Sequence, residues 1–102
     1  MASEIKIDGE LSGGSVDYYK VRIERPTTFA EPYMAECNDI IEALDMTFAE
    51  GNVFKAVWRI AAARIGKKKR GQTSVYDADK VEFFARRMKI KEETDARSNA
   101  TK

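Results

Sequence analysis

Three polar side chains at helical spacing are the residues of this sequence best suited to chemistry. Asn52, Lys55 and Arg59 recur at intervals of three and four residues, so on a helix they form one narrow line. Lysine and arginine bind phosphate oxygens, arginine through two parallel hydrogen bonds, and an asparagine amide can orient a base or a sugar. The line is therefore a candidate site for a phosphorylated ligand.

The neighbours of this line differ from those of a solvated helix face. Solvent favours a mixture of glutamate and lysine, whereas here the flanking residues are small: Gly51, Ala56, Ala62 and Ala63. Small residues permit another backbone to approach closely, so we expect the line to face a cleft or a neighbouring subunit. A cation removed from water requires a counter-charge. The nearest candidates are Glu36, Asp39 and Asp77.

Two interpretations of these residues stay open. In the structural interpretation they form ion pairs and caps, and Asp77 caps the helix that it begins. In the catalytic interpretation Lys55 contacts phosphate while Asp39 or Asp77 accepts a proton or holds a metal, as phosphoryl transfer requires. The candidate metal ligands for Mg²⁺ are Glu36 and Asp39.

The elements that must position these side chains follow from apolar periodicity. A first helix is predicted over 33–45, where Met34, Cys37 and Ile41 share one stripe. A second runs to residue 65; it begins with a capping box from Thr47 to Glu50 and stops at Gly66. Its expected core face consists of Phe54, Val57, Trp58, Ala61 and Ile65.

A third helix is predicted from Ser74 to about Ile90, and a short strand over 16–24, where apolar residues alternate. The expected fold is mainly α: a small three-helix domain over 16–91 with a short N-terminal β-strand or hairpin. A mobile leader over 1–15 precedes it, and a disordered tail over 92–102 follows, because neither stretch has a hydrophobic period.

Composition excludes several classes of protein. With 102 residues the chain has room for one domain, and its net charge of +1 gives no general attraction for nucleic acid or anionic membranes. There is no histidine, and Cys37 is alone, which excludes a disulfide within the chain, Cys/His zinc cages and a Ser-His-Asp triad. No apolar run approaches the ~20 residues that cross a bilayer, so we expect a cytoplasmic protein.

Two surface features add possible partners. A basic loop favours nucleic acid as an alternative ligand, although the neutral total charge and the lack of interleaved aromatic residues argue against it. Its cations are Arg64, Lys67, Lys68, Lys69 and Arg70. Tyr76, Phe83 and Ile90 lie off the main apolar stripe of the third helix, which predicts a subunit contact and a homo-oligomer.

Four segments in order resemble the SaV-like family of small bacteriophage proteins. They are Asp17-Tyr18-Tyr19, the E-C-x-D-x-I-E-A run at 36–43, the G-N-x-x-K-x-x-W-R run at 51–59 and the D-x-x-K-x-x-aromatic-aromatic run at 77–84. The match spans about 17–87. The chain departs from the family at Asp17, where histidine is common, at Ala56, where tyrosine often follows the lysine, and in its inserted basic loop.

The resemblance implies a nucleotide ligand, because many family members are labelled nucleotide kinases, and it implies the host cytoplasm as location. The residues that fit its pattern are Glu36, Asn52, Lys55, Arg59, Asp39, Asp77 and Lys80. No G-x-x-x-x-G-K-[ST] loop is present, which excludes a standard kinase. Three hypotheses remain: an atypical nucleoside monophosphate kinase that uses ATP and Mg²⁺, a non-catalytic protein that binds a nucleotide or a host defence protein, and nucleic-acid binding through the basic loop.

Overall fold

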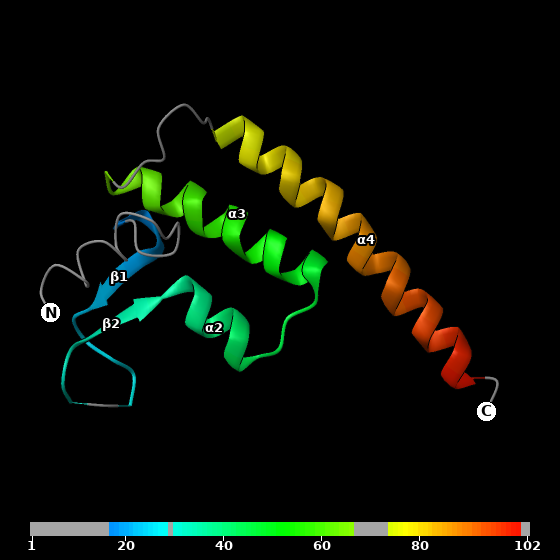
Figure 1. The fold of residues 1–102 in the computed structure, drawn as a ribbon, viewed down its shortest axis with the longest axis horizontal. Coiled ribbons are helices and arrows are strands. Elements are labelled where there is room, and N and C mark those ends of the chain that lie inside the picture. The colour runs from blue at the N-terminus through cyan, green and yellow to red at the C-terminus, as the bar shows by residue number, and fades with distance from the viewer. Residues whose placement is uncertain (1–16, 29, 67–73, 101–102) are drawn as a thin grey trace, which may run out of the picture.

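The structure, a computed structural model, describes residues 17–28, 30–66 and 74–100. Their elements are the 3-10 turn η2 (Asp17–Tyr19), the strands β1 (Lys20–Ile23) and β2 (Tyr33–Glu36), and the helices α2 (Cys37–Ala43), α3 (Phe48–Arg64) and α4 (Ser74–Ala100). Helix α3 lies in the middle, with α4 along one side and with η2, the strand pair and α2 on the other (Figure 1). The mainly α class, the three helices and the N-terminal hairpin are thus as predicted.

The strand pair corrects the predicted start of the first helix. Strand β1 pairs antiparallel with β2, with Lys20 opposite Glu36 and Ile23 opposite Tyr33. Residues 33–36 are therefore extended, and α2 begins only at Cys37. Met34 and Cys37 lie three residues apart, which imitates a helical period, but pairing with β1 supplies backbone hydrogen bonds that a local pattern does not reveal.

Helix α2 also ends two residues before its predicted end at Asp45. The amide of Asp45 bonds to the carbonyl of Glu42 at 3.1 Å, and the amide of Met46 bonds to that of Ile41 at 3.1 Å. These two bonds form a Schellman turn, in which Asp45 takes the left-handed conformation with a φ of 51°. The turn sends the chain directly into α3.

The predicted start of α3 is confirmed, and the helix ends one residue before its predicted end at Ile65. Thr47 Oγ1 accepts from the amide of Glu50 at 3.2 Å, and the Glu50 carboxylate accepts from the amide of Thr47 at 2.9 Å. The helix ends at Arg64, and Gly66 follows with a φ of 89°. Glycine suits this position because a Cβ atom disfavours positive φ.

Helix α4 is longer than predicted. It begins at Ser74 as expected but continues through Ala100, so residues 92–100 are helical and the predicted disorder of that stretch is wrong. The segment has no proline or glycine, and the Lys91 ammonium meets the Asp95 carboxylate at 3.0 Å one turn further on. Every residue of this stretch is exposed, and α4 projects beyond the rest of the molecule (Figure 1).

The buried face of α3 differs from the one that hydrophobicity predicts. Val57 and Ile65, expected in the core, are 49% and 65% exposed. Phe54, Trp58 and Ala61 are half-buried. The buried residues are instead on the polar and small-residue side of the helix: Gly51, Ala56, Arg59 and Ala62. Other elements pack against α3 on two sides, so the polar and small-residue side of the helix lies at the centre of the fold.

Loss of the capping box tests the start of α3. Thr47→Ala removes the acceptor for the amide of Glu50, and we expect it to lower the free energy of unfolding by about 1 kcal/mol. Urea titration followed by Trp58 fluorescence measures the change. Thr28→Ala, at an exposed position outside any helix or strand, is the matched control. Equal stability of the two variants would contradict the role of the cap.

Candidate functional site

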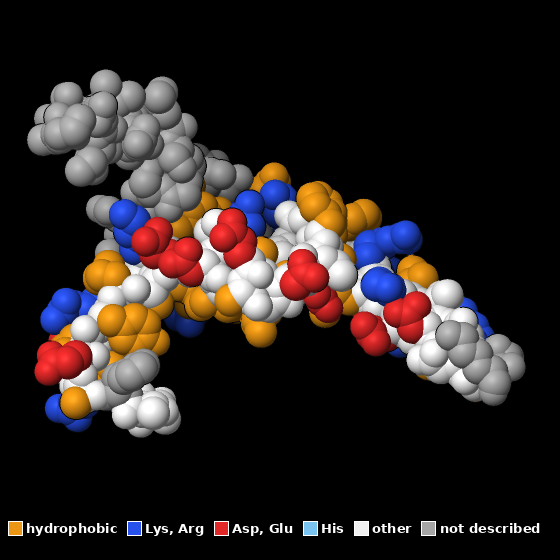
Figure 2. Space-filling view, turned by 60° about the horizontal axis from the view of Figure 1, so that its bottom comes forward, with side chains coloured by type: hydrophobic (Ala, Val, Ile, Leu, Met, Phe, Trp, Pro, Cys, Tyr) orange, Lys and Arg blue, Asp and Glu red, His pale blue; other side chains and the backbone are white. Residues whose placement is uncertain are grey.

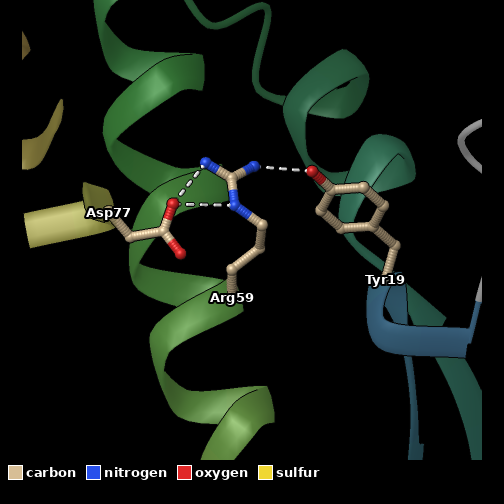
Figure 3. A network of polar contacts seen from close by, with 3 residues as sticks. All are labelled: Tyr19, Arg59 and Asp77. Atoms are coloured by element: carbon tan, nitrogen blue, oxygen red, sulfur yellow. Dashed lines mark hydrogen bonds and ion pairs between the residues drawn. The ribbon is translucent and has the colours of Figure 1, made fainter. Parts of the chain in front are cut away.

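The centre of the molecule is a buried ion pair between α3 and α4. Arg59 Nε and Nη2 both donate to Asp77 Oδ1, at 3.0 and 2.9 Å, and Nη1 donates to the Tyr19 hydroxyl at 2.6 Å (Figure 3). Both charged side chains are only 6% exposed. Burial alone lowers the pKa of a guanidinium, but the hydrogen bonds with Asp77 and Tyr19 outweigh it and raise the pKa of Arg59 above its ordinary value. Arg59 is therefore a permanent buried cation.

Three elements far apart in the sequence supply this network. Tyr19 ends η2, Arg59 lies in the third quarter of α3, and Asp77 is in the first turn of α4. The preceding residue of α3 repeats the connection, because Trp58 Nε1 donates to the carbonyl of Tyr18 at 2.7 Å. Adjacent residues of α3 thus hold adjacent residues of η2, while Arg59 also holds α4.

Small residues make room for the arginine. Ala56 and Ala62 are 0% and 6% exposed. At 100° per residue they lie about 60° to either side of Arg59 around the helix. Neither fills the space next to the guanidinium, so the turn η2 and the helix α4 can both reach it. The expectation that small neighbours accompany an inward-facing cation is confirmed for Arg59.

Lys55 lies one turn before Arg59 and has different surroundings. It is half-buried, and its Nζ is 5.9 Å from the centroid of the Tyr19 ring. No carboxylate forms an ion pair with it among residues 17–28, 30–66 and 74–100. Tyr19 therefore contacts both cations, Arg59 through its hydroxyl and Lys55 through its ring.

Cys37 is a buried residue within electrostatic range of the two cations. It is 2% exposed and is the first residue of α2. Burial raises the pKa of the Cys37 thiol, and the positive charges of Lys55 and Arg59 oppose this only in part. The thiol form is therefore favoured over the thiolate at neutral pH.

The remaining predicted site residues do not join this network. The Asn52 amide donates to the carbonyl of Phe48 in its own helix at 2.8 Å, and the Lys80 ammonium lies 5.2 Å from the Tyr76 ring centroid. Glu36 is the half-buried N-cap residue of α2 without a side-chain cap bond, and Asp39 is exposed.

The predicted metal ligands form no metal-binding cluster in the described part of the chain, and most of the predicted nucleic-acid residues lie outside it. Within the described part of the chain, no three cysteine or carboxylate side chains come close enough to hold a metal ion, so Glu36 and Asp39 have no third ligand there. Arg64 is exposed at the end of α3. The other cations of the basic loop, Lys67, Lys68, Lys69 and Arg70, lie outside the described residues.

Of the three acidic partners proposed from the sequence, the structure pairs Asp77 with Arg59. Tyr19 and Cys37 were missed as members of the site. Tyr19 lies in the predicted strand and in the first of the resembling segments, but neither pattern predicts a role for its hydroxyl, which is a partner that a buried guanidinium with several donors needs. Cys37 carried no separate signal, because a buried cysteine has the pattern of any small apolar residue.

Comparison with models of protein families, with the curated proteins and with the solved structures finds no match to this chain. The resemblance to SaV-like proteins stays a prediction. None of the described helices combines the length and the apolar character that a membrane span requires.

Removal of a single hydroxyl tests the buried network. Tyr19→Phe leaves Arg59 Nη1 without its acceptor, and a hydrogen bond to a charged group contributes about 1.5–3 kcal/mol. We expect a loss of about 2 kcal/mol in the free energy of unfolding, measured by urea titration. Tyr33→Phe, at a half-exposed strand position, is the control. A loss no larger than that of the control would show that the hydroxyl contributes nothing.

Proposed function

We propose that this chain binds a nucleotide through Lys55 and does not transfer a phosphoryl group. The observation that supports the proposal is the difference between the two cations of α3. Arg59 is neutralised by Asp77, whereas half-buried Lys55 has no carboxylate partner in the described part of the chain. A partly dehydrated ammonium is stabilised most by an anion that replaces its lost water, and a phosphate group is such an anion.

The surroundings of Lys55 suit an anion of this kind. The Tyr19 ring restricts the ammonium from one side, at 5.9 Å from the ring centroid. Asn52 lies three residues before Lys55 on the same face of α3 and is half-buried. Its amide nitrogen bonds to the helix backbone, which leaves the amide oxygen to accept from a sugar hydroxyl or a base.

The buried ion pair favours binding over transfer. In a kinase, Arg59 and Asp77 would contact phosphates or metal, but here each is the other's partner at 6% exposure. Turning either group toward a substrate would leave the other as a buried charge without its partner, which costs about 3–5 kcal/mol. The resemblance of the motif order to that of SaV-like phage proteins supports a nucleotide as the ligand, and the location would then be the host cytoplasm. The biological role that fits is sequestration of a nucleotide.

Nucleotide binding is tested with a panel of nucleoside mono- and triphosphates, each with and without Mg²⁺. Calorimetry measures affinity, and chromatography of the same mixtures detects conversion. We expect at least one nucleotide to bind and to be recovered unchanged. Lys55→Met should weaken that binding about tenfold or more, the equivalent of one charge-assisted hydrogen bond.

The control is Lys91→Met, which removes the same charge from the projecting part of α4. It should retain the affinity of the unmodified chain. Equal affinities for the two variants would contradict a role for Lys55. Conversion of a monophosphate to a diphosphate in the presence of ATP and Mg²⁺ would establish the kinase instead.

A further inference from the structure

Helix α4 carries an exposed apolar stripe on the side that does not face α3. Tyr76, Phe83 and Ile90 are 46%, 59% and 47% exposed. They are spaced by seven residues, which on an α-helix returns within about 20° of the same direction. The residues of α4 directed toward α3 lie on another face, with Asp77 buried and Phe84 in edge contact with Phe48 at 5.6 Å between centroids. The stripe is thus distinct from the contact that holds α4 in the fold.

The apolar surface extends beyond the stripe near its centre. The ring of Phe83 meets that of Phe84 edge-on, at 5.0 Å between centroids. Phe84 in turn contacts Phe48, which is 79% exposed at the start of α3. Three aromatic rings therefore lie in contact around the middle of α4. Exposed aromatic groups of this kind are typical of protein interfaces.

Between Tyr76 and Ile90, the exposed charges on one flank of the stripe are ordered about Phe83. On the N-terminal side, Asp79 and Glu82 are exposed acids; on the C-terminal side, Arg86 and Lys89 are exposed bases. By helical spacing, all four lie on one flank of the stripe. Lys80, on the other flank, is half-buried over the Tyr76 ring. Figure 2 shows both acidic and basic side chains exposed on the arm that α4 forms.

We propose that two copies of this chain associate through α4 in antiparallel orientation, with Phe83 at the two-fold axis. Tyr76 and Ile90 are each seven residues from Phe83, so a two-fold through that residue places Ile90 against the partner's Tyr76. In an antiparallel pair, the flank that carries these four charges faces the same flank of the partner helix. Asp79 and Glu82 then lie opposite the partner's Lys89 and Arg86. A parallel pair would place bases level with bases.

A second copy fits this surface because the surface is self-complementary. The acidic half and the basic half lie on opposite sides of a central apolar residue. A two-fold rotation therefore places the acidic half of one copy against the basic half of the other, as an isologous interface requires. The stripe from residue 76 to residue 90 is about 21 Å long at 1.5 Å per residue, which is four turns of contact. The projecting end of α4 would then lie beside the partner.

Sedimentation velocity over a range of concentrations tests the dimer, with helix content followed by circular dichroism. The unmodified chain should dimerise. Phe83→Glu places two carboxylates at the axis and should give a monomer of unchanged helix content. Val57→Glu, at an exposed apolar position of α3 away from the stripe, should leave the dimer intact.

Charge reversal tests the orientation. Asp79→Lys and Lys89→Glu should each weaken dimerisation about tenfold, because each change creates two like-charge contacts across the two-fold. The double variant restores opposite charges and should dimerise like the unmodified chain. A monomeric unmodified chain at concentrations of about 100 μM, or a double variant weaker than both single variants, would overturn the proposal.

Discussion

A buried arginine determines how this small protein is assembled. Arg59 bonds to Asp77 in α4 and to Tyr19 in η2, and so joins the two layers that lie on opposite sides of α3. The apolar residues buried to a comparable degree in the described part of the chain are small: Cys37, Ala56 and Ala62. The long arginine stem therefore fills space that a larger apolar residue fills in other small domains. The arginine can be buried because its neighbours are small, and the small neighbours leave space that the arginine fills.

Regular features with local causes were predictable from the sequence. The capping box at Thr47, the stop at Gly66 and the start of α4 at Ser74 each depend on a few adjacent residues, and each is where the sequence predicts it. The inward direction of Arg59 was predictable too, because Ala56 and Ala62 flank it. Asp77 was among three candidate partners, and only the packing of α4 against α3 selects it.

Features that depend on distant pairing were not predictable. Residues 33–36 form a strand because β1 is available beside them. Val57 and Ile65 remain exposed because α3 is covered on its polar face, which reverses the direction that hydrophobicity indicates. The terminal part of α4 is a different case, because it is helical through the local Lys91–Asp95 pair and the absence of proline and glycine, although its lack of a hydrophobic period predicts disorder. The Tyr19 hydroxyl has no sequence signal, since its role exists only beside Arg59.

The central claim is that Arg59 and Asp77 stabilise the fold as a pair, and a double-mutant cycle tests it most directly. Arg59→Met, Asp77→Leu and the double variant are compared by urea unfolding. Each single variant leaves one buried charge unpaired and should lose about 3–5 kcal/mol, whereas the double variant should lose far less than the sum. Additive losses would contradict the account, because they would mean that the two side chains contribute independently.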